Sequence, residues 1–247
     1  MSRFFPDSKI IHIPNTTSTN CRLLQLSNVE KLPEGSIVAT DNQTQGRGQA
    51  SNSWESAPGA NLTFSIVLYP TSVKASEQFI LSKVISLAVY DLVSEFVTGV
   101  SVKWPNDVYV DDKKIAGILI ENFVLGEYLT KTIAGIGLNI NQERFESDAP
   151  NPVSLRQLTG ETYGLEDCLK SLHERIAVRY HTMNEDATQI NSDYLKNLYR
   201  FGISNRFSAN GISFDAVITG VNHYGMLELT TENNELKTFG FKEIKFE

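Results

Sequence analysis

The sequence predicts an α+β fold in which helices pack on a mixed β-sheet and a small β-barrel follows. The predicted strands and helices do not repeat as β-α units, which argues against a doubly wound parallel sheet. From residue 202 onward only short β runs occur, and turn pairs separate them: Asn210-Gly211, Tyr224-Gly225 and Asn233-Asn234. We therefore expect two domains, residues 1–200 and residues 201–247.

The spacing of apolar residues predicts the elements of the first domain. Residues 76–97 have apolar side chains at helical spacing and more between them, so this helix should be largely buried. A second helical region covers 165–199, with an interruption near Asn184, and Ser18 in Thr17-Ser18-Thr19-Asn20 can cap a short helix through Leu26. Strands are expected at 9–13, 36–40, 62–69, 101–104, 108–110, 114–122 and 128–139.

The composition is that of an ordinary globular protein. The chain has 247 residues, of which 41% are hydrophobic and 21% charged, so it can bury a substantial core. A net charge of -7 argues against general binding to nucleic acid, which depends on clustered Lys and Arg. The first residues contain neither a signal peptide nor a membrane span, so we expect a cytoplasmic protein. Any anionic ligand must then be bound by local cations.

A long polar loop, residues 43–59, follows the second predicted strand. Gly46 and Gly48 allow backbone amides to approach an anion, and Arg47 between them offers planar donors to phosphate or carboxylate oxygens. Taken alone, this pattern fits a solvated turn equally well. Loops of this length are commonly lids or linkers, and the aromatic Trp54 favours a lid.

The segment Lys103-Trp104-Pro105-Asn106-Asp107 concentrates charge and backbone constraint in a predicted hairpin. Pro105 restricts Trp104 to extended backbone and fixes the bend, and Lys114 begins the apolar run that follows. A plain ion-pair pattern is the simpler explanation for such a hairpin when it is considered alone. However, Gly117 leaves room for a ligand or a neighbouring backbone within that run, and the stretch from Gly135 to Asn139 repeats the arrangement.

Together these segments resemble the biotin protein ligases, in order and over nearly the whole chain. The motifs that match are Ser18-Thr19-Asn20, Gln43 with Gly46-Arg47-Gly48, Trp54-Glu55-Ser56, Gly59-Ala60-Asn61-Leu62, Lys103-Trp104-Pro105-Asn106-Asp107, Lys114 to Leu119, and Gly135 to Asn139. The tail Phe239-Gly240-Phe241-Lys242-Glu243-Ile244 is similar to the SH3-like C-terminal barrel of that family. The resemblance implies a class II synthetase-like catalytic domain followed by this barrel.

The resemblance implies a reaction in two steps. Biotin and Mg-ATP, with Mg²⁺ sharing the phosphate charge, first give biotinyl-5′-adenylate and pyrophosphate. A lysine of a biotin carboxyl carrier protein, from acetyl-CoA carboxylase or a related carboxylase, then attacks the acyl group. The first predicted β run begins near Lys9 and leaves no room for a DNA-binding helix-turn-helix, so we expect a ligase without DNA binding, either a monomer or a weak homodimer.

The resemblance also assigns site residues. Ser18, Thr19, Asn20 and Gln43 would line the biotin head group, with Gly117 against the ring. The predicted catalytic residues are Arg47, Lys114 and Asp107. Arg47 and Lys114 would take the carboxylate and phosphate, whereas Asp107 would orient Lys114, assist the metal or receive the carrier lysine. Trp54 would close the lid over the adenylate, and the binding set is completed by Gly46, Gly48, Gln49, Asn106 and Asn139. No metal ligands are assigned.

One position departs from the family pattern, because Gln49 stands where the family loop commonly has a second arginine. Gln49 can donate through its amide but has no charge, so the adenylate should be held less tightly. Two other functions fit the resemblance: a lipoate or octanoate ligase or transferase, and a non-catalytic protein that senses biotin or binds the carrier. The Trp104-Pro105-Asn106-Asp107 motif favours biotin.

Overall fold

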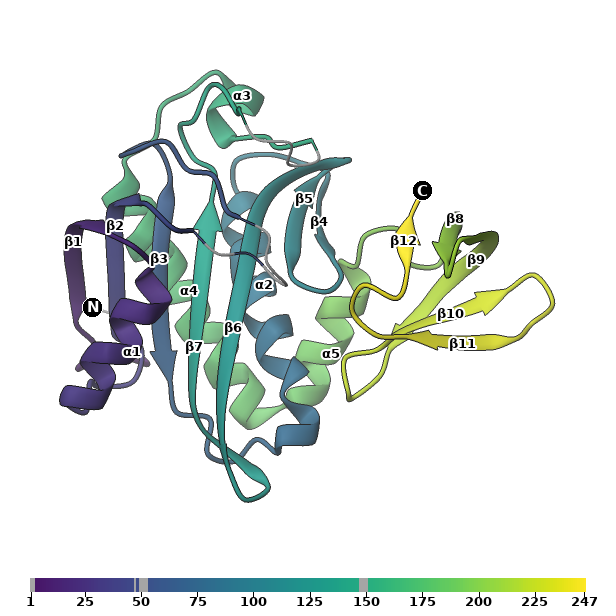
Figure 1. Ribbon diagram of the computed structural model, residues 1–247, viewed down its shortest axis with the longest axis horizontal. Helices are drawn as coiled ribbons and strands as arrows, with labels where there is room; N and C mark the ends of the chain where they lie inside the picture. Colours follow the sequence, from purple (N-terminus) through teal and green to yellow (C-terminus); the bar gives the residue numbers. More distant parts are fainter. Residues whose placement is uncertain (1–2, 47, 49–52, 147–150) are drawn as a thin grey trace.

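A mixed seven-stranded sheet forms the larger part of the molecule, in the order β1-β2-β3-β7-β6-β5-β4 (Figure 1). The computed structural model describes residues 3–46, 48, 53–146 and 151–247. The β1 and β2 strands pair in parallel, and the remaining neighbours pair antiparallel. The strands are β1 (Ile10–Thr16), β2 (Ile37–Gln43), β3 (Leu62–Leu68), β4 (Val100–Lys103), β5 (Asp107–Val110), β6 (Lys113–Leu125) and β7 (Tyr128–Leu138). The predicted mixed sheet is thus confirmed.

Helices cover the two faces of this sheet unequally. The helices are α1 (Thr19–Val29), the 3-10 turn η2 (Ala75–Glu77), α2 (Phe79–Val93), α3 (Leu155–Thr159), α4 (Leu165–Glu185) and α5 (Ala187–Lys196). Figure 1 shows α2, α4 and α5 behind the sheet and α1 in front of it. A small apolar cluster around Leu23, Val38 and Ile133 joins α1 to the sheet, and the main core lies on the other face. The front face beside α1 is therefore only partly covered.

Local capping explains where the helices differ from the prediction. The break between α4 and α5 falls at Asp186, two residues beyond the predicted Asn184, because the Asp186 carboxylate accepts hydrogen bonds from the first turn of α5. The α3 helix was not predicted, because its five residues are too few for an apolar period. Ser154 and Gln157 form a capping box that begins it.

The C-terminal part of the chain forms a five-stranded antiparallel sheet in the order β11-β10-β9-β8-β12. Its strands are β8 (Ser204–Ala209), β9 (Ile212–Val221), β10 (Leu227–Thr231), β11 (Leu236–Phe239) and β12 (Lys245–Phe246). The predicted turn residues Asn210, Gly211, Gly225 and Asn234 all have positive φ angles. We call this sheet and its connecting loops the C-terminal sheet; it is consistent with the SH3-like prediction. Within the described residues, no helix has the length and apolar character needed to cross a membrane.

Candidate active site

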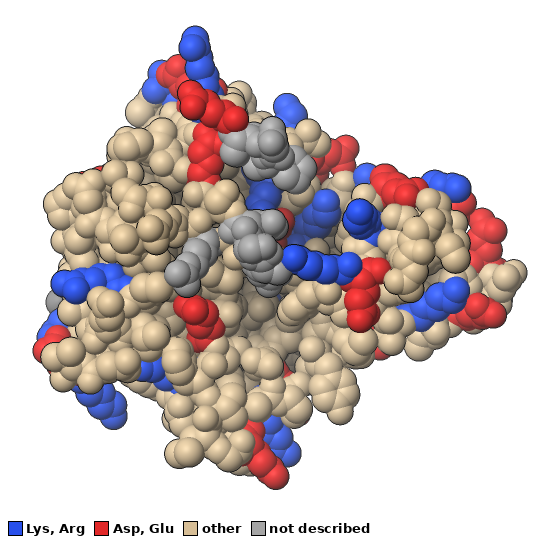
Figure 2. Space-filling model, viewed as in Figure 1, with Lys and Arg blue, Asp and Glu red and all other residues tan. Residues whose placement is uncertain are grey.

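A cavity of about 870 Å³ opens on the partly covered face of the large sheet. In Figure 2 the hollow lies near the centre of the view, and Lys and Arg side chains gather on its right, between the two sheets. Its floor is formed by β3, β6 and β7, and the N-terminus of α1 closes one end. Phe241, Lys242, Ile244 and Phe246 of the C-terminal sheet line it from the other side. The cavity therefore draws on segments from both sheets.

One end of the cavity is polar and uncharged; we call it the head end, and it consists of Ser18, Thr19, Asn20 and Gln43. The Ser18 hydroxyl caps α1 by accepting a hydrogen bond from the Cys21 amide at 3.5 Å, so it both begins the helix and lines the cavity. Gln43, at the end of β2, accepts from the Thr19 amide through Oε1 at 2.8 Å. Since the oxygen is engaged, the Gln43 amide nitrogen is the end that remains for a ligand.

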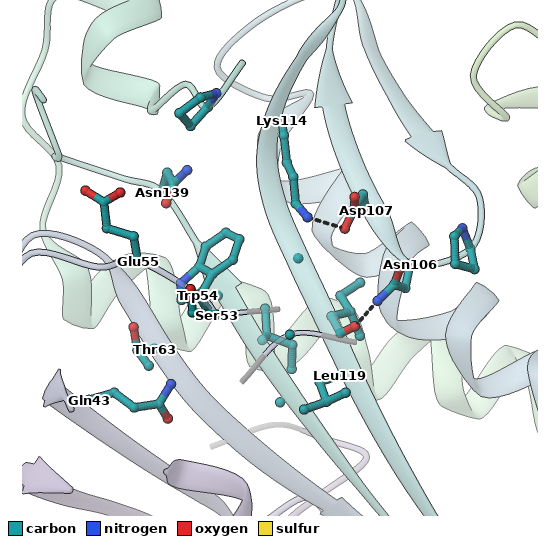
Figure 3. Close-up of a pocket in the computed structure, with 18 of the residues that line it drawn as sticks. Gln43, Ser53, Trp54, Glu55, Thr63, Asn106, Asp107, Lys114, Leu119 and Asn139 are labelled. Carbon is teal, nitrogen blue, oxygen red and sulfur yellow. Dashed lines mark hydrogen bonds and ion pairs between the residues drawn. The ribbon is translucent and has the colours of Figure 1, made fainter. Parts of the chain in front are cut away.

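The opposite end is charged and consists of Lys114 and Asp107. Lys114 Nζ lies 2.7 Å from Asp107 Oδ1, and the side chains are 23% and 22% exposed, so both are partly desolvated. Burial raises the pKa of Asp107 above its ordinary value, while the Lys114 ammonium opposes this rise. The pairing of β5 with β6 places Asp107 opposite Gly117 and so brings the two side chains to one place. Figure 3 shows this ion pair on one wall of the cavity.

Trp54 lies between these two ends (Figure 3). Its indole packs against the backbone of Gly117 and Gly137: a Cβ at these glycines would come within 2.9 Å and 2.3 Å of ring atoms. Lys114 Nζ is 5.7 Å from the centre of the Trp54 ring. Within the described part of the chain, Trp54 Nε1 is buried and has no hydrogen-bond partner. This nitrogen faces Gly137, where a Cβ would lie 2.4 Å from it, so the donor is covered by the cavity floor.

Two asparagines line the side of the cavity toward the C-terminal sheet and α3. The Asn106 amide nitrogen donates to the Ile118 carbonyl and so holds the β5–β6 hairpin closed. The Asn139 amide nitrogen donates to the Val153 carbonyl at 3.1 Å, whereas its Oδ1 is buried without a partner among the described residues. Because a buried unpaired acceptor is costly, Asn139 Oδ1 suits a ligand that brings a donor.

Lys103 and Trp104 contact the C-terminal sheet. The Lys103 ammonium lies 4.4 Å from the ring centre of Tyr109 and 5.0 Å from that of Phe246 in β12, and burial lowers its pKa. Trp104 Nε1 donates to the Gly225 carbonyl at 2.8 Å. The Trp104–Pro105 peptide bond is cis. Trp104 lines the cavity, but Lys103 is not among the described lining residues.

The structure brings most of the predicted site residues together. Those that line the cavity are Ser18, Thr19, Asn20, Gln43, Gly48, Trp54, Asn106, Asp107, Lys114, Gly117 and Asn139. Gly46 is not among the described lining residues; its carbonyl accepts from the Trp54 amide at 3.1 Å. Arg47 and Gln49 lie outside the described residues.

Sequence reasoning did not assign to the site the four residues of the C-terminal sheet that line the cavity, because they are remote in the chain from the other lining residues. They are Phe241, Lys242, Ile244 and Phe246. Sequence reasoning also missed Ser65, which lies behind the head end. A signal for Ser65 exists, because Thr63 and Ser65 place hydroxyls on one face of an otherwise apolar strand. In the described residues, no group of three His, Cys, Asp or Glu side chains is placed to hold a metal ion.

Comparison with known proteins identifies the family. The model of the biotin/lipoate A/B protein ligase family matches residues 12–139, just over half of the chain. The chain therefore belongs to this family, and the predicted resemblance is confirmed.

Three similar proteins are ligases by name. The chain is 33% identical over 168 residues to the biotin--[acetyl-CoA-carboxylase] ligase of Paracoccus denitrificans, covering 65% of this chain and 68% of that protein. It is 29% identical over 233 residues to the bifunctional ligase/repressor BirA of Bacillus spizizenii, covering 90% of this chain and 70% of that protein. The structure of the biotin protein ligase from Aquifex aeolicus in complex with biotin and ATP superposes with a TM-score of 0.79 at 25% identity, covering 97% of this chain and 98% of that one.

Proposed function

We propose that this chain is an ATP-dependent biotin protein ligase. It activates biotin as biotinyl-5′-adenylate with release of pyrophosphate, and transfers the biotinyl group to a lysine of a biotin carboxyl carrier protein in the cytoplasm. The observation that carries the proposal is that one cavity joins a neutral hydrogen-bonding end, Thr19 and Gln43, to a charged end, Lys114 and Asp107. A neutral ureido ring attached to a carboxylate chain requires this combination.

The head end suits the biotin ring. A ureido group presents one carbonyl acceptor between two N–H donors, and the cavity offers the Gln43 amide nitrogen, the Ser18 and Thr19 hydroxyls and the Asn20 side chain. Gly117 has no side chain in the floor between the two ends, and the Trp54 ring packs on its backbone. A dithiolane ring, as in lipoate, has no N–H or carbonyl and would offer no hydrogen-bond partner to the Gln43 amide nitrogen, so the alternative lipoate function is not favoured.

The charged end suits activation. The biotin carboxylate attacks the α-phosphorus of ATP, a new P–O bond forms, and the bond to pyrophosphate breaks. Both reactants are anionic, so a fixed cation lowers the barrier by stabilising the charge that develops between them. We assign this role to Lys114, with Asp107 holding its ammonium in place. Arg47 is assigned to the same anions, and Gly46, Gly48 and Gln49 to the loop that covers them.

Nucleotide binding is assigned to the remaining wall. Asn139 Oδ1 would accept a hydrogen bond from the exocyclic amino group of adenine, because it is buried and unpaired. Asn106 supports this wall through the Ile118 carbonyl. Mg²⁺ would enter as part of the Mg-ATP substrate: it commonly binds one or two carboxylates and the substrate phosphates, and the carboxylates of Asp107, Glu55 and Glu146 line the cavity.

The transfer step requires that the adenylate survive until the carrier arrives. Trp54 packs on the cavity floor between the two ends, and we propose that it excludes water from the acyl phosphate. The carrier lysine, as a neutral amine, then attacks the acyl carbon; an amide bond forms and AMP leaves. The division into a catalytic domain, residues 1–200, and a C-terminal domain, residues 201–247, belongs to this proposal and is supported by the start of β8 at Ser204.

The test combines the protein with Mg-ATP and either biotin or lipoate, and follows pyrophosphate release and labelling of an apo carrier domain. The proposal predicts both signals with biotin and neither with lipoate. Activation of lipoate alone would replace it with the lipoate function, and biotin binding without pyrophosphate release would indicate a non-catalytic sensor or carrier-binding protein. As a control for contaminating ligase, Lys114→Ala should abolish adenylate formation. The oligomeric state, monomer or weak homodimer, stays a prediction.

A further inference from the structure

A chain of hydrogen bonds runs behind the head end of the cavity and reaches the exposed surface of β6. Asn20 donates from Nδ2 to Glu121 Oε2 at 2.7 Å and lies 3.4 Å from the Leu119 carbonyl oxygen. Ser65 Oγ lies 2.5 Å from Asn20 Oδ1 and 2.7 Å from Thr19 Oγ1. Ser65 is fully buried, whereas Glu121 is exposed, and neither is among the described residues that line the cavity. Both therefore act on the cavity only through Thr19 and Asn20.

This series of hydrogen bonds has a defined direction, because some of its members can only accept a hydrogen bond. The Glu121 carboxylate and the Leu119 carbonyl accept from the Asn20 amide, so the nitrogen of that amide faces them and its oxygen faces Ser65. An amide oxygen cannot donate, so the single hydroxyl hydrogen of Ser65 points to Asn20. Ser65 Oγ can then only accept from Thr19.

This direction fixes what Thr19 can offer to a ligand. Its hydroxyl hydrogen has two acceptors within the protein, Ser65 Oγ at 2.7 Å and Gln43 Oε1 at 3.2 Å. In both arrangements the hydrogen stays within the protein, and only oxygen lone pairs remain for the cavity. Gly135 pairs with Ser65 across β3 and β7, and Asn20 Oδ1 packs directly on it: a Cβ at Gly135 would lie 2.4 Å from this oxygen. This close packing restricts rotation of the Asn20 amide.

We propose that Ser65 and Glu121 are positioning residues that make Thr19 an obligatory hydrogen-bond acceptor and thereby select a ligand ring with an N–H group at that point. The inference rests on the proposed function and deepens it, because it names the groups that select the ureido ring. Gln43 supplies the complementary donor: Figure 3 shows its amide nitrogen directed toward Thr63, which also lines the cavity. The head end thus presents a fixed acceptor and a fixed donor.

The test compares biotin with its two cyclic carbamate analogues, in each of which one ureido N–H is replaced by oxygen. Equilibrium binding is measured by calorimetry on the whole protein. Wild type should bind the isomer that places oxygen opposite Thr19 about 100-fold more weakly than biotin, because two acceptors would face each other. In Ser65→Ala the Thr19 hydroxyl loses its nearer partner, and only Gln43 Oε1 at 3.2 Å then competes with the ring oxygen for its hydrogen. Biotin should therefore bind about tenfold more weakly, and the discrimination between biotin and this isomer should fall about tenfold.

Variants of Glu121 test this series of hydrogen bonds without disturbing the core. Glu121→Met removes the acceptor that orients Asn20. Like Ser65→Ala, it should reduce the discrimination between biotin and the carbamate isomer. Glu121→Gln keeps an acceptor oxygen and should preserve this discrimination. Glu127→Met, an exposed glutamate at the tip of the same hairpin, is the matched control and should change nothing. The KM for ATP should stay constant in every variant, which a general loosening of the fold would not allow.

Two failures are distinguishable. If wild type does not bind biotin, the proposed function fails and the inference fails with it. If wild type binds biotin and rejects the oxygen isomer, but Ser65→Ala and Glu121→Met reject it equally well, the proposed function stands and the positioning role is wrong. Should Ser65→Ala not fold, the result for Glu121→Met decides, because Glu121 is exposed and its substitution leaves the core intact.

Discussion

Replacing Lys114 with methionine should separate the catalytic role of its charge from its role in stability. Methionine keeps most of the side-chain length and removes only the ammonium, which lies 2.7 Å from Asp107 Oδ1. The substitution therefore removes a cation from the charged end of the cavity. It also leaves Asp107 without its ion-pair partner.

The catalytic effect should be large. One fixed electrostatic group in a partly desolvated site is typically worth a factor of about 100 to 1,000 in rate, so adenylate formation should slow by that factor. Biotin binding in the absence of ATP should weaken only a few-fold, because Thr19 and Gln43 at the other end of the cavity are untouched. Stability at neutral pH should fall by about 1–3 kcal/mol, the cost of leaving a partly buried polar group unpaired. The lower part of this range is expected, since Asp107 keeps some contact with solvent.

The loss of stability should depend on pH, and its sign follows from Asp107. Burial already raises the pKa of this carboxyl in the folded protein, and without the Lys114 ammonium the folded-state pKa rises further. A carboxyl whose pKa is higher in the folded state than in the unfolded state favours folding when protonated, and this contribution is lost as pH rises through the folded-state value. The stability deficit of Lys114→Met relative to wild type should therefore be largest at neutral pH and shrink on acidification.

Urea unfolding at neutral and mildly acidic pH, together with single-turnover pyrophosphate release, measures both effects. The double variant Lys114→Met with Asp107→Asn should regain stability at neutral pH, because no unpaired charge remains, but it should not regain activity. The reasoning is refuted if Lys114→Met forms adenylate within fivefold of the wild-type rate, a margin far below the effect of a typical electrostatic group. It is also refuted if the stability deficit grows as the pH falls.

Three further substitutions test other parts of the site. Gly137→Ala would place a Cβ 2.3 Å from the Trp54 ring, so the indole must move; adenylate release should accelerate, and Trp54 fluorescence should report the displacement. Trp104→Phe removes the donor to the Gly225 carbonyl and should lower the free energy of unfolding, measured in urea, by about 1–3 kcal/mol; an unchanged value would contradict a structural role. Gln49→Arg restores the charge of the family pattern and should slow release of biotinyl-adenylate; equal or faster release would show that position 49 does not contact the phosphate.

The sequence predicts well those elements that depend on local patterns. Ser18 caps α1 as expected, because a hydroxyl before an apolar run satisfies the free amides of a first turn. The buried helix is α2, shorter than the predicted 76–97, because the apolar pattern continues into flanking turns that contain i→i−3 hydrogen bonds, such as that from the Glu95 amide to the Leu92 carbonyl. Lys114 and Gly117 both line the cavity from β6 although they are three positions apart, because a β-bulge shifts the register between β5 and β6 at this point.

Long-range contacts could not be predicted in this way. The surroundings of Lys103 combine Tyr109 from the next strand, Tyr199 from the segment after α5 and Phe246 from the last strand, and no periodicity relates these three positions. Ser65 lies in a strand that is buried along its whole length, and the hydroxyls of Thr63 and Ser65 on one face of it do not by themselves indicate what they contact. Its role depends on the side chain of Asn20, 45 positions earlier, which only the folded sheet brings close.

The Lys103-Trp104-Pro105-Asn106-Asp107 segment has different partners at its two ends. Lys103 and Trp104 contact the C-terminal sheet through Phe246 and the Gly225 carbonyl, whereas Asp107 pairs with Lys114 at the charged end of the cavity. Only the cis bond and the turn through Pro105 and Asn106 separate these contacts. The contacts to the C-terminal sheet and the charged end of the cavity therefore lie within five consecutive residues. Because Lys242 of that sheet lines the same cavity, a ligand that contacts both Lys242 and Lys114 would favour the attached position of the C-terminal sheet.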